Sequence, residues 1–427
     1  MDIQYNYNQQ KNEKKSGSKY FWIGLLTGLL VALLLVGCGY AAVRVAGYVK
    51  SSLTAGGNET GDSGQAMDQA STEALLQKME LVESVIDSYF YQEDVDKQAM
   101  ADGALKGMVS SLGDVYSEYY TAAELEEVFN SIEGIYYGIG AYVSMDTYTG
   151  LAKISGIIAG APAEEVDIRE DDLIYAVDDR ETYGKTLDEV VAQIKGPEGT
   201  KVTLTLLRSG EYVDVEVERR LVEAPTVNSE MFDDGIAYIQ ITEFSEVTID
   251  QFAEALAVAK GSDMKGLILD LRSNPGGSLH AVVEIAKQIL PKGLVVYTED
   301  RSGHREEYSC DGSRKLQVPM VVLINGNSAS ASEILAGAIK DYHMGTLLGT
   351  TTYGKGIVQQ AIPLSDGSAV KLTISTYYTP NGTNIHGTGI EPDEVCEFDA
   401  ERYYGEEEYD NQLEKAKELI RRLIYEL

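Results

Sequence analysis

The sequence is poor in the side chains that most often bind metals or transfer protons. Its 427 residues include three cysteines and four histidines, at Cys38, Cys310, Cys396, His280, His304, His343 and His386. No CxxC pair and no Cys/His spacing typical of zinc occurs, so we expect neither a metal nor a cofactor. His343 and His386 are formal candidates for a Ser-His-Asp triad, but neither lies in a triad motif. A Cys310–Cys396 disulfide and two free thiols fit the sequence equally well.

Basic residues are also scarce. There are 35 Lys and Arg against 68 Asp and Glu, which gives a formal net charge of −33. A field of that sign repels phosphates, so a nucleic-acid partner is not expected. With 44% hydrophobic residues, the chain is long enough for two or three packed domains.

One long hydrophobic run stands near the N-terminus. Residues 1–20 are polar and rich in lysine, whereas residues 21–43 carry no charge. A run of about 20 apolar residues spans a bilayer as a helix, and preceding lysines favour a cytoplasmic tail. We therefore expect residues 21–43 to anchor the chain in the cell membrane as a single pass. The catalytic part would be extracytoplasmic, beyond a Ser/Gly/Asp-rich linker at 44–71.

A second form of anchoring competes with the first. Leu35-Val36-Gly37-Cys38 resembles a bacterial lipobox, after which Cys38 would be lipidated and become the new N-terminus. The uncharged run continues past Cys38, which favours the transmembrane anchor. Either form would hold the rest of the chain on the outer face of the membrane.

The remaining chain divides by its hydrophobic period into four regions. Residues 72–131 have a helical period, and residues 132–220 show short strands with one helix at 187–194. Residues 221–398 alternate strands and helices, which predicts an α/β fold with a central sheet. Residues 399–427 form a charged tail that ends in an amphipathic helix, a candidate contact in a homo-oligomer.

The strand-rich region matches a small PDZ-like domain, a β-rich module with one helix beside a sheet edge. Its segment Tyr137-Gly138-Ile139-Gly140 would be the carboxylate-binding loop. Glycines there let backbone N–H groups point at a terminal carboxylate while an extended peptide joins the strand edge. The simpler interpretation is a hairpin whose glycines only turn the chain.

A nucleophile candidate lies in the segment Pro319 to Asp341. An apolar strand ends at Asn325-Gly326, three serines follow at 328, 330 and 332, and a helix then begins. Free N–H groups at a helix N-terminus stabilise negative charge, and the N–H of Ala331 would serve a nucleophile at Ser330. On this segment alone, an ordinary serine cap explains the pattern better.

Two further segments favour catalysis. Lys355 lies between Gly354 and Gly356 in an uncharged, apolar stretch, and burial of a lysine leaves a neutral amine that accepts a serine proton. The strand ending in Asn274-Pro275-Gly276-Gly277 offers N–H groups for an oxyanion, although a simple strand–helix turn also explains it.

Together these segments resemble a C-terminal processing peptidase of the tail-specific protease family. The likeness covers residues 75–398 and rests on motifs in the family's order. They include Gly113-Asp114, Tyr116-Ser117, Asn274-Pro275-Gly276-Gly277, Ser328 to Glu333, Tyr353 to Gly356, Tyr378 to Gly382 and Gly389 to Asp393. A departure is Val115, where the family commonly has proline, and it lies far from the chemistry in sequence.

The resemblance implies roles for individual residues. Ser330 would be the nucleophile, Lys355 the base and Gln359 the residue that orients the lysine, with Gly276 and Ala331 as the oxyanion hole. Glu333 matches a position that is often acidic in the family, without an assigned role. The implied enzyme is a serine endopeptidase that cleaves proteins near their C-termini, and its partners are proteins with accessible C-terminal tails.

Two other functions remain open at this stage. A catalytically silent scaffold would use the PDZ-like domain alone, but intact Ser330, Lys355 and Gln359 weigh against it. An acyl-CoA hydratase or isomerase would share the general form of the core, but the lysine segment and the PDZ-like insertion weigh against it.

Overall fold

The computed structural model describes residues 69–92, 94–405 and 408–426. The chain divides into two compact units, Met1–Val95 and Asp96–Leu427. The hydrophobic segment 21–43 and the lipobox cysteine Cys38 lie outside the described residues. Within the described residues, no helix has both the length and the hydropathy needed to cross a membrane.

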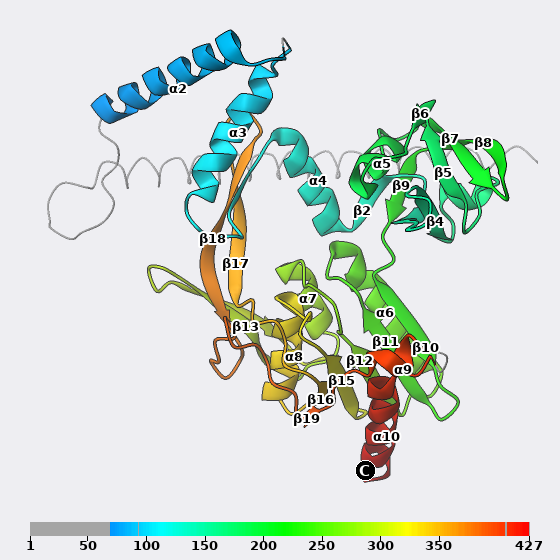
Figure 1. Ribbon diagram of the computed structural model, residues 1–427. Helices are drawn as coiled ribbons and strands as arrows, with labels where there is room; N and C mark the ends of the chain where they lie inside the picture. Colours follow the sequence, from blue (N-terminus) through cyan, green and yellow to red (C-terminus); the bar gives the residue numbers. More distant parts are fainter. Residues whose placement is uncertain (1–68, 93, 406–407, 427) are drawn as a thin grey trace, which may run out of the picture. The chain divides into compact units, whose positions relative to one another are not determined.

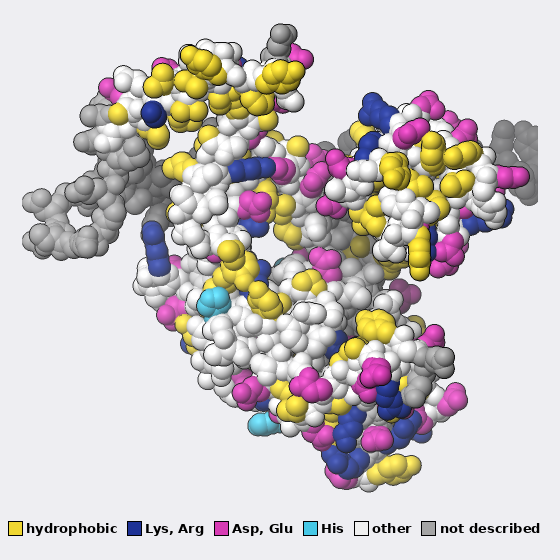
Figure 2. All heavy atoms as spheres, in the orientation of Figure 1, with side chains coloured by type: hydrophobic (Ala, Val, Ile, Leu, Met, Phe, Trp, Pro, Cys, Tyr) yellow, Lys and Arg dark blue, Asp and Glu magenta, His cyan; other side chains and the backbone are white. Residues whose placement is uncertain are grey.

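The first unit contributes one described helix, α2 (Gln69–Tyr89). Hydrophobic side chains along α2 are exposed to solvent, as Figure 2 shows for one face of the molecule. They are Leu75, Leu76, Met79, Leu81, Val82, Val85 and Tyr89. Among the residues that the structure describes, no other segment covers these side chains, and tertiary packing of an apolar face is what usually stabilises a helix.

The second unit is built on a six-stranded sheet in the order β10-β11-β12-β15-β16-β19. Only the β10–β11 pair is antiparallel, and the other neighbours run parallel. The strands are β10 (Val227–Met231), β11 (Ile236–Ile241), β12 (Gly266–Asp270), β15 (Met320–Ile324), β16 (Thr346–Gly349) and β19 (Glu394–Val395). Strands β12 and β15 are buried along their whole length, as expected where helices cover both faces of a parallel sheet.

Alternate residues of the strands enter two separate cores. Leu267, Leu269 and Val322 face a large core shared with α6 (Glu246–Gly261), α7 (Leu279–Ala286) and α8 (Ala331–Asp341). Ile268 and Val321 face the other side, where α10 (Asn411–Tyr425) covers the sheet. The alternation of strands and helices predicted for residues 221–398 and the α/β class are confirmed.

The C-terminal helix α10 packs on its own chain. Its buried residues Ala416, Leu419 and Ile420 contact the sheet, so this face is not available for an oligomer contact. At the N-terminal end of α10, the Arg272 guanidinium bridges the buried Asp270 carboxylate at 2.6 Å and Asp410 at 2.8 Å. A short helix, α9 (Ala400–Tyr403), precedes it.

A second sheet has the order β1-β18-β13-β14, with β17 also paired to β18. Its strands are β1 (Glu118–Tyr120), β13 (Gly293–Asp300), β14 (Arg305–Cys310), β17 (Ile357–Pro363) and β18 (Ala369–Tyr378). The long β17–β18 hairpin is prominent in Figure 1 and carries the segment after Lys355. Strand β1 brings the N-terminal region, with α3 (Lys97–Ser110) and α4 (Ala122–Glu133), into this sheet.

The PDZ-like region forms its own sheet in the order β3-β4-β5-β7-β8, with β6 paired to β5. Its elements are β3 (Ala141–Met145), β4 (Ala152–Ile157), η1 (Pro162–Glu165), β5 (Leu173–Val177), β6 (Arg180–Glu181), α5 (Leu187–Ile194), β7 (Lys201–Arg208) and β8 (Glu211–Glu218). The helix predicted at 187–194 is therefore confirmed. Strand β2 (Ile135–Gly138) precedes this sheet in the sequence and strand β9 (Arg220–Glu223) follows it. The two strands pair with each other in antiparallel fashion.

The two cysteines described are both free. Cys310 is buried and Cys396 is partly buried, so of the two states compatible with the sequence the structure has the thiols unpaired.

Candidate active site

The three segments singled out in the sequence follow three adjacent parallel strands. Asn274–Gly277 comes after β12, Ser328–Ser330 after β15, and the lysine segment after β16. The carboxyl ends of parallel strands meet at one edge of a sheet, and ligands of α/β proteins bind there. The fold therefore gathers the segments at one edge.

Ser330 has a strained backbone at the junction of β15 and α8. It is the N-cap of α8, with φ 55° and ψ −111°. A positive φ is uncommon for a residue with a side chain, and such strain is found at functional sites. The turn holds Ser330 partly exposed, in the manner of a nucleophile on a sharp strand-to-helix turn.

The neighbouring serines have structural contacts. Ser328 is fully buried and donates its hydroxyl to the Leu271 carbonyl at 2.8 Å. Ser332 is also fully buried and donates to the Asn274 carbonyl at 3.0 Å. Among the three serines, Ser330 alone has a partly exposed side chain.

The Glu333 carboxylate joins the serine segment to the lysine segment. It is fully buried, and one oxygen, Oε2, accepts the N–H of Ser330 at 2.8 Å and the N–H of Lys355 at 2.9 Å. The other oxygen accepts the N–H of Gly354 at 2.7 Å and the Thr352 hydroxyl at 2.6 Å. The S-x-x-E spacing of a capping box was a signal in the sequence for the bond to Ser330. The bond to Lys355 had no such signal.

We expect Glu333→Gln to loosen this link. A glutamine presents an NH₂ group to backbone donors that now share a carboxylate, so buried N–H groups lose their partners. The free energy of unfolding should fall by roughly 2–4 kcal/mol and the cleavage rate by about 10²-fold. Chemical denaturation and peptide cleavage measure the two effects. The exposed Glu254→Gln on α6 is the matched control, and equal effects of both substitutions would contradict this role.

The predicted oxyanion donors differ in their surroundings. The N–H of Ala331 belongs to the first residue of α8, and no hydrogen bond from it is seen in the described part of the chain. The N–H of Gly276 donates to Asn274 Oδ1 at 2.8 Å and would have to change partner to bind an oxyanion. A Cβ on Gly276, where φ is 104°, would lie 2.7 Å from the Ser330 Cβ, so this position requires glycine.

Lys355 is half-buried, and its side chain extends over an aromatic ring. Its Nζ lies 4.6 Å from the centre of the Tyr116 ring. Burial lowers the pKa of Lys355, the charge of Lys371 lowers it further, and Asp114 acts against both. Among the described residues no hydrogen bond joins this amine to Ser330 or to Gln359.

Gln359 lies on β17 directly opposite Thr373 of β18. Its Nε2 donates to the Thr373 hydroxyl at 3.4 Å. The side chain predicted to orient the lysine is therefore in the neighbourhood of Lys355, but it is bonded to a residue that the sequence did not single out.

Tyr377 is a further side chain of the site that sequence reasoning missed. It is buried, and its hydroxyl donates to the Lys355 carbonyl oxygen. Burial raises the pKa of Tyr377 well above its ordinary value, the Glu333 charge adds to the rise, and the nearby Ser330 side chain opposes it. The tyrosine therefore stays neutral beside both predicted catalytic residues.

The loop before β1 also reaches the site. Tyr116 lies under the Lys355 amine, and Asp114 influences the pKa of that amine. Val115 lies between them and is exposed. The departure at Val115 is thus far from the chemistry in sequence but adjacent to it in space.

The histidines considered for a triad are both exposed. No hydrogen bond from the side chain of His343 or His386 to a carboxylate is seen among the described residues. The backbone of His386 packs against the glycine after the lysine, since a Cβ on Gly356 would lie 2.5 Å from its nitrogen.

The predicted peptide-binding loop is divided between a strand and a turn. Tyr137 and Gly138 belong to β2 and pair with β9, whereas Ile139 and Gly140 form the turn into β3. Their carbonyls accept hydrogen bonds from Ala163 and Ile158, and no bond from the N–H of Ile139 or Gly140 is seen in the described chain. Two donors at the start of β3 thus remain for a ligand.

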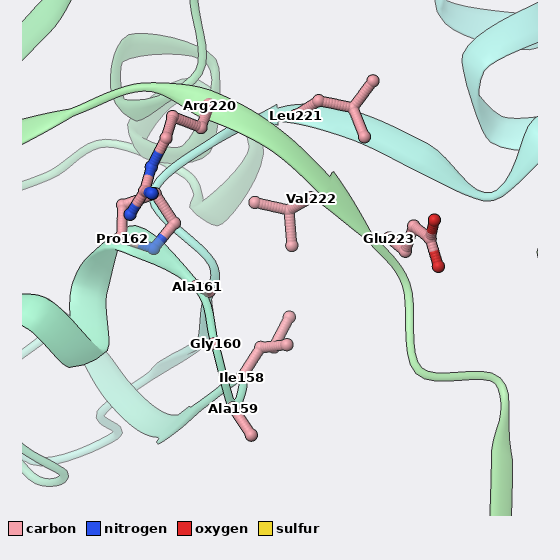
Figure 3. Close-up of a pocket in the computed structure, with 9 residues that line it drawn as sticks. All are labelled: Ile158, Ala159, Gly160, Ala161, Pro162, Arg220, Leu221, Val222 and Glu223. Atoms are coloured by element: carbon pink, nitrogen blue, oxygen red, sulfur yellow. The ribbon is translucent and has the colours of Figure 1, made fainter. Parts of the chain in front are cut away.

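A pocket of about 190 Å³ lies beside this turn, where the Gly140 carbonyl accepts the N–H of Ile158. It is lined by the loop Ile158–Pro162 and by Arg220–Glu223 of β9. Figure 3 shows Val222 and Ile158 pointing toward each other across it. None of the predicted catalytic or peptide-binding residues lines it, so we assign the cavity no part in the chemistry.

Three family models match the chain. Peptidase family S41 matches residues 235–396, PDZ domain matches residues 153–208, and Activating protease CtpB N-terminal domain matches residues 34–123. The PDZ match covers most of the β-rich region between β2 and β9. The peptidase match covers five of the six strands of the parallel sheet, β11 to β19, and includes Ser330 and Lys355.

Characterised relatives are similar over most of the chain. The carboxy-terminal processing protease CtpA of Bacillus subtilis is 36% identical over 356 residues, 81% of this chain and 76% of that protein. The carboxyl-terminal-processing protease of Synechocystis is 36% identical over 300 residues, 69% of this chain and 70% of that protein. The solved photosystem II D1 C-terminal processing protease is 28% identical, covers 74% of this chain and 86% of its own, and superposes with a TM-score of 0.45. By the two sequence likenesses and the peptidase match, this chain belongs to the carboxy-terminal processing proteases, serine peptidases of family S41 with a PDZ domain.

Proposed function

We propose that this carboxy-terminal processing protease cleaves peptide bonds by acyl transfer to Ser330, with Lys355 as the general base. The observation that carries the proposal is the Glu333 carboxylate, one oxygen of which binds the N–H groups of both residues. Two residues held by one oxygen atom have their backbones side by side. Ser330 is also the serine of its segment that has a partly exposed side chain and a strained backbone.

The reaction would proceed in two balanced steps. The neutral Lys355 amine takes the hydroxyl proton as Ser330 Oγ attacks the scissile carbonyl carbon, and the carbonyl oxygen becomes an oxyanion near the N–H of Ala331. The lysine then gives its proton to the leaving amine, and an ester remains on Ser330. Water then attacks the ester carbonyl while Lys355 takes a proton from it. The bond between that carbon and Ser330 Oγ breaks, Lys355 returns the proton to Oγ, and the carboxyl product leaves.

The environment of Lys355 favours the neutral amine that this mechanism needs. Burial lowers its pKa and so raises the fraction of neutral amine at a given pH. Lys371, from β18, acts in the same direction. A lysine on an exposed surface would remain protonated and could not accept the proton at neutral pH.

The lysine side chain must turn before the reaction. Its amine now lies over the Tyr116 ring, with no bond to Ser330 among the described residues. The four-carbon stem of lysine rotates readily, so the change requires no rearrangement of the backbone held by Glu333. We call this contact with Tyr116 the resting position of the lysine.

The PDZ domain would hold the substrate C-terminus. Strand β3 is an edge of its sheet, pairs only with β4 in the described structure, and packs near α5. An extended peptide added to this edge would place its carboxylate at the free N–H groups of Ile139 and Gly140. The left-handed backbone at Gly140, with φ 74°, keeps that turn tight.

We expect amidation of a substrate C-terminus to weaken cleavage. Hydrogen bonds to a charged group contribute about 1.5–3 kcal/mol, so kcat/KM should fall about 10- to 100-fold, mainly through KM. Matched peptides with a free or amidated C-terminus test this in steady-state kinetics. N-terminal acetylation, which removes the charge at the other end, is the control and should change little. Equal kinetics for the free and amidated peptides would rule out carboxylate recognition.

We further propose that residues 21–43 anchor the enzyme in the cell membrane with its catalytic part outside. The length of the uncharged run and the lysines before it support this, and lipidation of Cys38 is the alternative. A homo-oligomer stays a prediction. Its support is the exposed apolar surface of α2 rather than the C-terminal helix.

A further inference from the structure

A chain of hydrogen bonds leads from the N-terminal region to the residue proposed to orient Lys355. The Gln359 amide donates to Thr373 Oγ1 at 3.4 Å, and that hydroxyl donates to Asp114 Oδ2 at 2.7 Å. Asp114 precedes β1, whereas Gln359 and Thr373 lie on the two strands of the β17–β18 hairpin, so two segments far apart in sequence meet here.

The Asp114 carboxylate is fixed by several donors at once. Its Oδ2 also accepts the Ser117 hydroxyl at 2.6 Å, and its Oδ1 accepts the N–H of Tyr116 at 3.1 Å. Hydrogen bonds from Ser117 and Thr373 lower the pKa of Asp114, so the carboxylate is ionised and can only accept. The single proton of the Thr373 hydroxyl is therefore committed to Asp114.

This commitment decides which way the Gln359 amide faces. A hydroxyl whose proton is already donated can only accept, so Thr373 can bond the NH₂ group of Gln359 but not its carbonyl oxygen. The carbonyl oxygen is then directed away from Thr373. A carbonyl is the group that an ammonium needs, because lysine offers donors alone.

We propose that Asp114 and Thr373 are positioning residues that fix the Gln359 amide, so that its carbonyl oxygen accepts a hydrogen bond from the Lys355 amine when the lysine turns toward Ser330. This role rests on the proposed function of Lys355 as the base. Asp114 acts through Thr373 and Gln359, and neither Asp114 nor Thr373 touches the reacting atoms.

The same loop holds the lysine in its resting position. Asp114 binds the N–H of Tyr116, and the ring of Tyr116 lies under the Lys355 amine. Burial raises the pKa of Tyr116, and the neighbouring Tyr353 adds to the rise, so the ring stays neutral. The Asp114 carboxylate thus holds both Tyr116, which contacts the lysine in its resting position, and, through Thr373, Gln359, which would bind the lysine during catalysis.

The decisive substitution is Thr373→Val, which keeps the shape of the side chain and removes the hydroxyl. Gln359 then loses the partner that fixes its amide, and kcat should fall about 10-fold while KM changes less than twofold. Thr373→Ser restores a hydroxyl and should recover most of the lost kcat. Thr376→Val is the matched control on the same strand, since the Thr376 hydroxyl bonds Tyr378 at 3.4 Å and should leave kcat unchanged.

A second variant, Asp114→Asn, tests the negative charge of the carboxylate to which the Thr373 hydroxyl donates. The groups that face the Lys355 side chain are Lys371 from β18, and Asp114 and Tyr116 from the loop before β1. Removing the negative charge leaves the repulsion by Lys371 unopposed, so the lysine pKa falls. The acid limb of the kcat/KM profile should move to lower pH and the plateau should also fall. Thr373→Val should lower the plateau of the kcat/KM profile but shift its acid limb less than Asp114→Asn does.

All variants are measured in the full chain with one internally quenched peptide that ends in a free, apolar C-terminus. Wild-type kcat in Thr373→Val, or an equal loss in Thr373→Ser, would overturn the positioning role, as would an unmoved acid limb in Asp114→Asn. Lys355→Ala in the same series separates the two proposals. An active Lys355→Ala refutes the base itself, whereas an inactive one beside a normal Thr373→Val refutes only the positioning role.

Discussion

Replacing Ser330 by alanine is expected to abolish peptide cleavage and to leave the fold intact. The substitution removes the oxygen that would form the acyl-enzyme, and loss of a catalytic serine costs on the order of 10⁴- to 10⁶-fold in kcat. The side chain is partly exposed, and its backbone contacts to Glu333 do not depend on the hydroxyl. Thermal unfolding should therefore remain close to that of the wild type.

The neighbouring serines supply matched controls for this result. Ser328→Ala and Ser332→Ala each remove a buried hydroxyl that donates to a carbonyl oxygen. Each carbonyl keeps a backbone donor, the N–H of Asn274 or of Ala329, so the cost in stability is about 0.5–1.5 kcal/mol. Activity per folded molecule should largely persist in both. If Ser330→Ala kept its activity while either control lost it, the nucleophile would have to be reassigned.

Lys355→Ala is expected to remove most activity, and Lys355→Arg should not restore it. Arginine keeps the positive charge but stays protonated at any working pH, so it cannot take the serine proton. We expect both variants to lose about 10³-fold or more in kcat. Near-normal activity in the arginine variant would contradict a lysine base and would make His343 and His386 candidates for the base.

The direction of the pH dependence follows from the same group. Lys355 acts only as the neutral amine, and burial lowers its pKa below the ordinary value for lysine. Activity should thus be low while the amine is protonated and should rise with pH through this lowered pKa. Gln359→Ala should reduce the rate without abolishing it, because the amide orients the amine and carries no proton.

Much of the fold could be predicted from periodicity. The helix at 187–194 and the helices of the core follow patterns that reflect burial on one face, and the strands β12 and β15 are continuous apolar runs. Strand β17 was not predicted. It begins directly after Gly356, and its middle has Gln359 and Gln360 in place of a clear alternation of apolar and polar residues. Pairing with β18, rather than local preference, makes it a strand.

The candidate site was predictable where its residues are close in sequence or carry a familiar motif. Ser330 and Ala331 at a strand–helix junction are such a case. The Glu333 bond to Ser330 is local and could have been predicted from the S-x-x-E spacing, whereas its bond to Lys355 depends on two strands lying side by side. Tyr377 was missed because nothing in a strand sequence says which face meets the active site.

The contribution of the loop before β1 could not be predicted for the same reason. Asp114 and Thr373 are separated by most of the chain and meet only because β1 pairs with β18. No sequence period records a contact of that kind. The prediction of burial from sequence has a similar limit. A lysine between two glycines suggests a buried amine, but the sequence does not show that the Tyr116 ring lies beside it.

The most direct test of the central claim is to trap the nucleophile. The full-length chain is treated with a fluorophosphonate, which reacts covalently with an activated serine, and the modified residue is located by peptide mass spectrometry. The account predicts a single adduct on Ser330 in the wild type, a much slower reaction in Lys355→Ala and Lys355→Arg, and no adduct in Ser330→Ala. An adduct on another serine, or labelling of Ser330 at an unchanged rate in both lysine variants, would contradict it.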